Sequence, residues 1–294
     1  MKLGYYPGCS MHGTAREFDE SLQAIAKPLG LELTELDDWS CCGATSAHAT
    51  NRLLGVALPA RNLALAEQQG FKDVFAPCAA CYSRLATARH EMQEDAKLDA
   101  KVKEILKRPF SNSVGVMNIV EVLRGLIPQI KEQAVQPLSE LKVACYYGCL
   151  LLRPAEITGF DDAEDPSSME DVTRATGATP VEWRMRTECC GGSFSLSRTG
   201  SVVRLGRAVI NDARAAGANA IVVACPMCHS NLDFRQQAMG QREGATEMPI
   251  LYLPQLVGLA LGLSPQTLGL KRHFVSTQPV LELVAAGAAK GEVK

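Results

Sequence analysis

The chain lacks three features that would place it in an obvious class. Its longest apolar stretch, residues 251–263, is too short to cross a bilayer and contains Pro254. The first six residues lack the apolar core of a secretory signal. The 30 Lys and Arg residues nearly balance the 32 Asp and Glu residues, so no charge excess marks a surface for nucleic acid or anionic membranes. These absences predict a cytoplasmic protein with no membrane span and no nucleic-acid partner.

A dinucleotide-binding motif is also missing. No GxGxxG follows an expected strand, so the sequence offers no flavin or nicotinamide site. With 294 residues, 47% of them hydrophobic and 21% charged, the composition is that of a globular protein with one large domain or two smaller ones. Electrons for any redox reaction would therefore arrive from a partner protein.

What the sequence does contain is cysteine in a repeated pattern. Eleven cysteines are too sparse in a chain of this length for a small disulfide scaffold, so metal or redox chemistry is expected. With Cys145 set aside, two sets share one order: a single cysteine, an adjacent pair followed by glycine, and a CxxC motif. The first set is Cys9, Cys41, Cys42, Cys78 and Cys81, and the second is Cys149, Cys189, Cys190, Cys225 and Cys228. We therefore predict a duplicated unit, with one cysteine-rich domain over residues 1–137 and another over 138–294.

Strands and helices are expected to alternate along each half. The expected strands are residues 2–6, 31–36 and 113–119 in the first half and 141–147, 180–185 and 248–253 in the second, with a further apolar run before each CxxC. Helical periodicity covers 15–29, 52–69 and 202–216, and Gly70 and Gly217 stand where helix-ending glycines belong. The mixed-charge stretch 91–108 is expected to be a solvated amphipathic helix. Residues 160–169 are expected to be a surface loop that enters a helix capped by Ser167 or Ser168.

This alternation predicts an α/β fold made of two pseudo-symmetric, Rossmann-like halves with mostly parallel sheets. Ligand sites in such sheets lie beyond the carboxyl ends of the strands. All three cysteine segments of each half follow expected strands, so the five cysteines of a set are expected to converge.

Several kinds of site use cysteine, and they differ in how many they need. Structural zinc takes four ligands in a tetrahedron, which leaves a fifth cysteine over and fits an adjacent pair poorly. A thioredoxin-like CxxC leaves Cys9, Cys41 and Cys42 without a role. Iron–sulfur clusters fit better, because thiolates hold them and several irons are available to adjacent cysteines. Cys145 has no counterpart in the first half and is expected to be a small buried hydrophobic residue.

Neighbouring residues support a bulky inorganic centre. A CxxC at a helix N-terminus is favoured because the backbone N–H groups and the helix dipole stabilise thiolates. Gly43 and Gly191, directly after the adjacent pairs, would let the backbone approach a cofactor without a Cβ clash. His12, His48 and His229 lie near cysteine segments and are expected to be hydrogen-bonding neighbours rather than proton donors.

The pattern resembles the CCG cysteine-rich domain of the heterodisulfide reductase family. Two copies in one chain are similar to the HdrB component of that enzyme and to its bacterial sulfur-oxidising homologues. The resemblance covers nearly the whole chain, including segments 5–9, 76–82, 146–149, 152–154 and 159–162. It implies that each set of five cysteines binds one noncubane 4Fe-4S cluster. It also implies two partners, an HdrC-like subunit that resembles a ferredoxin and carries iron and sulfur, and an HdrA-like flavoprotein.

The implied reaction is the cleavage or formation of a disulfide between the two clusters. Splitting a disulfide takes two electrons and leaves two thiolates, and a cluster normally supplies one electron at a time. Two clusters that face one cavity would each deliver one electron and accept one sulfur, with iron as the Lewis acid. A coenzyme disulfide and lipoate-bound or persulfide sulfur both remain open as substrates. The alternatives are a non-catalytic electron-transfer subunit of a dehydrogenase complex and a zinc-stabilised scaffold.

Overall fold

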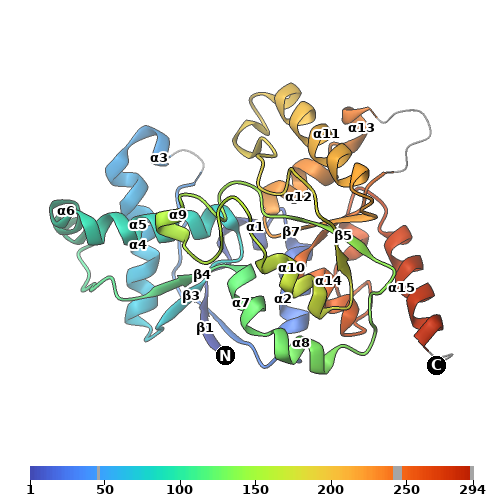
Figure 1. Ribbon diagram of the computed structural model, residues 1–294. Coiled ribbons are helices and arrows are strands. Elements are labelled where there is room, and N and C mark those ends of the chain that lie inside the picture. Colours follow the sequence, from blue (N-terminus) through green and yellow to red (C-terminus); the bar gives the residue numbers. More distant parts are fainter. Residues whose placement is uncertain (45–46, 241–246, 292–294) are drawn as a thin grey trace.

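The computed structural model describes residues 1–44, 47–240 and 247–291, and it contains two α/β halves (Figure 1). Each half has a four-stranded parallel sheet, with strand orders β2-β1-β3-β4 and β6-β5-β7-β8. The strands are β1 (Lys2–Tyr5), β2 (Glu32–Glu35), β3 (Asp73–Phe75), β4 (Gly115–Met117), β5 (Lys142–Tyr146), β6 (Thr179–Pro180), β7 (Ala220–Val223) and β8 (Ile250–Tyr252). The two sheets have the same order, which confirms the predicted fold class and the pseudo-symmetry of the halves.

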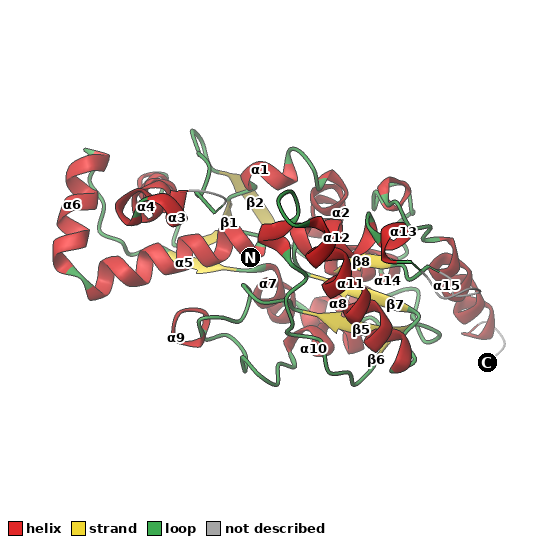
Figure 2. Ribbon diagram, turned by 90° about the horizontal axis from the view of Figure 1, so that it is seen from above, coloured by secondary structure: helices red, strands yellow, loops and turns green. Residues whose placement is uncertain are grey.

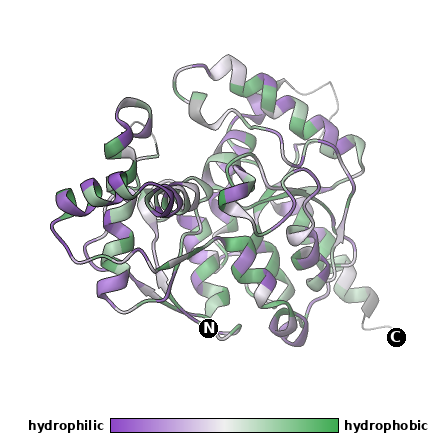
Figure 3. Cartoon of the chain, turned by 60° about the vertical axis from the view of Figure 1, so that its left-hand side comes forward, coloured by the Kyte–Doolittle hydropathy of each residue, from purple (hydrophilic) through white to green (hydrophobic). Residues whose placement is uncertain are grey.

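Helices connect the strands and cover both faces of the sheets (Figure 2). The helices of the first half are α1 (Gly8–Met11), α2 (Arg16–Ala26), α3 (Ala47–Thr50), α4 (Arg52–Gln68), α5 (Ala79–Glu94), α6 (Ala96–Leu106), α7 (Ile119–Gly125) and α8 (Ile127–Gln133). Those of the second half are α9 (Ala155–Thr158), α10 (Ser168–Ala175), α11 (Thr199–Ala215), α12 (Pro226–Asp233), α13 (Gln236–Met239), α14 (Leu253–Ala260) and α15 (Gln278–Gly291), with short 3-10 turns at Gly192–Phe194 and Leu270–Arg272. Hydrophilic and hydrophobic residues alternate around the outer helices (Figure 3), as expected for helices with one face on a core. Among the described residues, no helix combines the length and apolarity needed to cross a membrane.

The long expected helices are confirmed, and their ends differ by a few residues. Gly70 and Gly217 follow α4 and α11 with φ of +80° and +82°, the left-handed conformation that ends a helix. The stretch 91–108 is not one helix, because the chain breaks at Asp95. The Asp95 carboxylate accepts the N–H groups of Lys97 and Leu98, both at 3.0 Å, and so starts α6 as a separate helix.

Two other expectations in the second half are wrong in detail. Of the strand expected over 180–185, only Pro180 belongs to a strand, as the second residue of β6, since the chain turns so that Trp183 Nε1 donates to the Cys145 carbonyl at 3.1 Å. Ser167 occupies the N-cap position of α10, but its side chain makes no capping hydrogen bond. The Asp161 carboxylate caps this helix instead, accepting the N–H groups of Ser167 and Ser168 at 3.0 and 2.7 Å.

The two halves share one hydrophobic core through reciprocal helix contacts. The helix that follows the fourth strand of each half packs on a helix that follows the first strand of the other half: α7 on α10, and α14 on α2. Phe18 of α2 stacks on Tyr252 of β8 with ring centroids 4.4 Å apart. Arg272 donates to the Glu20 carboxylate at 2.7 and 3.0 Å. The carboxyl ends of both sheets are thereby fixed relative to each other.

Candidate functional site

The first set of cysteines gathers beyond the carboxyl ends of β1, β2 and β3. Cys9 lies on α1 and Cys42 on the loop after β2, while Cys78 and Cys81 begin α5. The Sγ atoms of Cys42 and Cys81 are 3.4 Å apart. A hydrogen bond with the Cys81 thiol, helped by backbone N–H groups at the start of α5, lowers the pKa of Cys78 to about 7. Burial and the charges of neighbouring cysteines raise the pKa of Cys9.

The second set has a matching arrangement beyond β5, β6 and β7. Cys190 Sγ lies 3.6 Å from Cys228 Sγ, and Cys149 Sγ lies 3.9 Å from Cys189 Sγ. A hydrogen bond from Cys149, together with backbone N–H groups of the glycines that follow the pair, lowers the pKa of Cys189 to about 5. The same hydrogen bond, followed by burial, raises the pKa of Cys149. The structure therefore brings the residues of each predicted set together from distant parts of the sequence.

Both sets have a buried side and an open side. The buried side consists of the second cysteine of each adjacent pair and the two cysteines of each CxxC: Cys42, Cys78, Cys81, Cys190, Cys225 and Cys228. On the open side, Cys9, Cys41 and Cys189 are exposed and Cys149 is half-buried. Within the described residues, the upstream cysteine and the first cysteine of the pair are therefore the members of each set that solvent reaches most easily.

Gly8 and Gly148, which directly precede Cys9 and Cys149, allow a close backbone approach that was not predicted from the sequence. Both have positive φ, at +60° and +69°. A Cβ on Gly8 would lie 2.9 Å from Cys81 Sγ, and one on Gly148 would lie 3.0 Å from Cys228 Sγ. Only glycine fits, because any side chain would displace a CxxC sulfur. The repeated Gly-Cys dipeptide at the start of each set was the available signal.

Gly43 and Gly191 also have positive φ, at +77° and +82°, but an added Cβ would point away from the sulfurs. On Gly43 it would lie 3.1 Å from the Leu58 side chain, and on Gly191 it would lie 3.2 Å from Val202 Cα. These glycines therefore let the loop pack on α4 and α11. Their N–H groups face the sulfur two residues earlier, at 3.4 Å in the first set and 3.2 Å in the second. If Gly43 and Gly191 help to hold a cofactor, they would do so through these N–H groups, which donate to a cysteine sulfur.

Tyr6 and Tyr146 hold the loops that carry the adjacent cysteine pairs from the buried side. Both are fully buried, and their hydroxyls donate to the carbonyls of Ser40 at 2.8 Å and Glu188 at 2.6 Å. These carbonyls belong to the residues directly before each adjacent pair. Burial, followed by the negative charge of nearby cysteines, raises the pKa of both phenols, so they stay neutral. In the sequence, these tyrosines stand out only as part of the repeat.

The three predicted histidines have ordinary hydrogen-bonding or ion-pair partners. His12 Nε2 lies 3.4 Å from the Glu35 carboxylate, and His48 Nδ1 lies 3.5 Å from the Gly43 carbonyl. His229, directly after Cys228, is buried, and burial holds its pKa well below the usual range. A neutral imidazole therefore adjoins the second site.

His229, Asp233 and His273 bring potential ligand atoms within 4.8 Å of one another, but hydrogen bonds already use them. Gln255 Oε1 accepts the Tyr252 N–H, so Gln255 Nε2 faces His273 Nε2 at 2.8 Å and donates to it. The His273 proton then lies on Nδ1, 3.3 Å from His229 Nε2, and both nitrogens hydrogen-bond the Ile250 carbonyl, which lies 3.2 Å from His229 Nε2. The Asp233 carboxylate accepts two backbone N–H groups at 2.7 and 3.1 Å. This cluster holds the ring beside Cys228 in place.

Cys145 stands apart from both sets, in agreement with the prediction. It is fully buried on β5, and its Sγ lies 3.3 Å from Thr173 Oγ1 of α10. Burial, followed by the charge of Glu170, raises its pKa well above that of a free thiol. This cysteine is a packing residue with no thiolate character.

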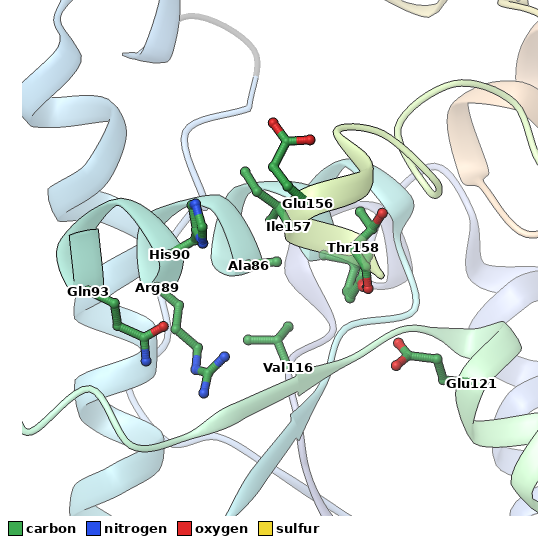
Figure 4. A pocket seen from close by; sticks show the side chains of 10 residues that line it. Ala86, Arg89, His90, Gln93, Val116, Glu121, Glu156, Ile157 and Thr158 are labelled. Atoms are coloured by element: carbon green, nitrogen blue, oxygen red, sulfur yellow. The ribbon is translucent and has the colours of Figure 1, made fainter. Parts of the chain in front are cut away.

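A separate polar cavity of about 260 Å³ lies where the two halves meet, beside α5 and α9 (Figure 4). Arg89 and Gln93 lie toward one end and Glu121 toward the other (Figure 4). Tyr82, directly after Cys81, also lines it, and its hydroxyl donates to the Thr158 carbonyl at 3.3 Å. Burial raises the pKa of Glu121 to about 7.

The donor sets fit a soft, multi-metal centre better than a single zinc ion. Each set has five cysteines, where zinc takes four ligands. Several thiols have lowered pKa values, and backbone N–H groups point at sulfur. Thiolates with such donors are the ligands of iron–sulfur clusters.

Comparisons with known proteins agree with this chemistry. Residues 3–86 and 143–233 each match the cysteine-rich domain called CCG. The chain is 34% identical to the 8-methylmenaquinol:fumarate reductase membrane anchor subunit of Wolinella succinogenes, over 93% of this chain and 97% of that one. It is 30% identical to the HdrB component of the ferredoxin/F420H2-dependent CoB-CoM heterodisulfide reductase of Methanosarcina acetivorans, over 93% and 94%.

Among solved structures, a hypothetical protein from Helicobacter pylori superimposes with a TM-score of 0.72 at 13% identity. The match covers 94% of this chain and 52% of that one, so this chain corresponds to about half of that protein. At this identity the likeness supports the fold alone.

Proposed function

Because the chain belongs to the family of CCG cysteine-rich domain proteins, which includes the HdrB component of heterodisulfide reductase, we propose that it is the catalytic iron–sulfur subunit of a heterodisulfide-reductase-like complex. It would cleave or form a disulfide, or handle lipoate-bound or persulfide sulfur, in one-electron steps. The observation that carries the proposal is the presence of two complete sets of five cysteines, each with a buried side and an open side.

Each set would hold one noncubane 4Fe-4S cluster, through Cys9, Cys41, Cys42, Cys78 and Cys81 in the first half and Cys149, Cys189, Cys190, Cys225 and Cys228 in the second. When bound, such clusters supply electrons one at a time and an iron that stabilises a thiolate. The Gly8 and Gly148 backbones leave room beside the CxxC sulfurs, and the N–H groups of Gly43 and Gly191 donate toward sulfur.

The surrounding residues would fix the two sites and control access to them. The open sides, formed by Cys9 with Cys41 and by Cys149 with Cys189, define where a sulfur substrate approaches. Tyr6 holds the loop before one pair, and Tyr146 holds the loop before the other. A ferredoxin-like iron–sulfur protein of the HdrC type and a flavoprotein of the HdrA type would deliver electrons, because the sequence has no dinucleotide-binding motif of its own.

A second candidate function is electron transfer without a sulfur substrate. It is favoured by the similarity to the Wolinella succinogenes protein, which is described as part of a methylmenaquinol:fumarate reductase. In that role the two sites would form a path for electrons in a dehydrogenase-type complex, and no disulfide would need to reach their open sides.

Half-site variants separate the two functions. Cys42→Ala and Cys190→Ala each remove one buried sulfur, and spectroscopy identifies the cluster that survives. With a reduced viologen dye as donor, disulfide cleavage is expected to fall at least a hundredfold in both variants, since two electrons and two sulfurs need two sites. Substantial cleavage by either variant, or none by the intact complex with several disulfides, contradicts the catalytic proposal and favours electron transfer.

A further inference from the structure

The two sites match closely around one buried sulfur in each. Cys42 and Cys190 are both the second cysteine of an adjacent pair, and each faces the last cysteine of its CxxC at 3.4 and 3.6 Å. Each also has a backbone N–H two residues further on directed at its sulfur, from Ala44 in the first half and Gly192 in the second. An additional hydrogen-bond donor at the sulfur of Cys42 or of Cys190 would therefore give the two sites different hydrogen bonding at this position.

Asn231 is such a donor in the second site. It lies on α12, one turn from Cys228, and only 1% of its surface is exposed. Asn231 Nδ2 lies 3.5 Å from Cys190 Sγ and 3.4 Å from the Cys190 carbonyl. A carbonyl can only accept, so the amide must present its N–H groups on this side. Its Oδ1 points the other way and accepts the Ser195 hydroxyl at 2.8 Å.

The first half has no equivalent side chain among its described residues. The third residue after the CxxC, which corresponds to Asn231, is Arg84, and it is only partly buried. Within the described ranges, the groups that hydrogen-bond Cys42 Sγ are the Cys81 thiol and backbone N–H groups. A buried amide directed at sulfur thus distinguishes the second site from the first.

We propose that Asn231 raises the reduction potential of the second centre by donating to the Cys190 sulfur. A donor N–H stabilises the more electron-rich state of a thiolate-bound cluster, and hydrogen bonds to sulfur are among the factors that set cluster potentials. The inference rests on the proposed function, which places an iron–sulfur centre in each set. Asn231 acts through Cys190 and is a positioning residue.

A redox titration of the anaerobically purified full chain, followed by electron paramagnetic resonance, tests the inference. The intact protein is expected to show two transitions. In Asn231→Ala one transition, that of the second centre, moves to a more negative potential, with about a tenfold lower ratio of reduced to oxidised centre at the original midpoint, which is about 59 mV for one electron. The other transition stays in place. Ser230→Ala, which changes the exposed neighbour on the same helix, moves neither.

A second variant keeps the test valid if Asn231→Ala loses its iron–sulfur centre. Ser195→Ala frees the Asn231 amide without emptying the space beside Cys190, and a smaller shift of the same transition in the same direction is expected. Full iron content with no shift in either variant, or equal shifts of both transitions, overturns the inference and leaves the proposed function standing. A wild-type protein that binds no iron in its second set refutes the proposed function itself.

Discussion

At the scale of single residues, the glycines before the upstream cysteines give the sharpest expectation. Gly148→Ala places a Cβ 3.0 Å from Cys228 Sγ in a left-handed conformation, so the second set should lose its centre while the first set keeps its own. Gly217→Ala is a matched control, because Gly217 has φ of +82° and open space around it. Both variants should lose about 1–2 kcal/mol of stability from backbone strain. Iron analysis should show a loss only in Gly148→Ala, and equal iron in the two variants would contradict this role of Gly148.

Cys145 and Cys149 lie close in sequence but have different roles. Cys145→Ala removes a buried sulfur that contacts Thr173, so it should reduce the free energy of unfolding by about 1 kcal/mol and keep both centres. Cys149→Ala removes a member of the second set, so it should lose or distort that centre. Iron and acid-labile sulfide, measured on both purified variants, decide the matter. Equal loss from both variants would show that the wrong cysteine was set aside.

The cysteine sets were predictable from sequence because one cysteine pattern occurs twice, in the same order and with similar flanking residues. Asn231, Tyr6 and Tyr146 were not, since their roles depend on contacts with loops far away in the sequence. The sequence also could not show why residues 43 and 191 are glycine. The direction in which a Cβ would point there depends on the backbone conformation.

At the scale of elements, the start of α10 tests how this chain caps a helix. The Asp161 carboxylate accepts two N–H groups there, while the Ser167 side chain accepts none. Asp161→Ala is therefore expected to lower the free energy of unfolding by about 1 kcal/mol, and Ser167→Ala by less than about 0.5 kcal/mol. Urea unfolding of the two variants measures both values, and a larger loss from Ser167→Ala would restore the serine cap expected from sequence.

Hydrophobic periodicity located the long helices and most strands. It failed where a single polar contact determines where a helix or strand ends. The stretch 91–108 has helical composition throughout, but the Asp95 side chain ends one helix and starts another. The stretch 180–185 is apolar enough for a strand, but the Trp183 indole turns inward to the Cys145 carbonyl. Composition cannot distinguish these cases, because the partner groups lie elsewhere in the chain.

At the scale of the whole molecule, Glu121 makes stability depend on pH where the halves meet. Burial raises its pKa from about 4.5 to about 7, so the folded chain holds the proton more tightly than the unfolded chain. Glu121 therefore lowers the free energy of unfolding as pH rises from about 4.5 to about 7. Glu121→Gln removes this penalty, and its urea midpoint relative to wild type should be higher at pH 8 than at pH 5. An unchanged difference between the two pH values would contradict the raised pKa.

The duplicated architecture could be predicted from the repeat, because each copy carries the same succession of apolar runs and cysteine segments. The reciprocal packing of α7 on α10 and of α14 on α2 could not, since it joins helices from opposite halves. Nor could the inequality of the two sites, because the repeat that reveals the cysteines makes the sites look alike.

The central claim is that each set of five cysteines holds its own iron–sulfur centre. Its most direct test is the iron and sulfide content of anaerobically purified wild type, Cys42→Ala and Cys190→Ala. With two 4Fe-4S clusters, wild type should contain about eight irons per chain and each variant about four, with a different surviving spectrum in each variant. Zinc with negligible iron in wild type, or complete loss of iron from either variant, would contradict two independent centres.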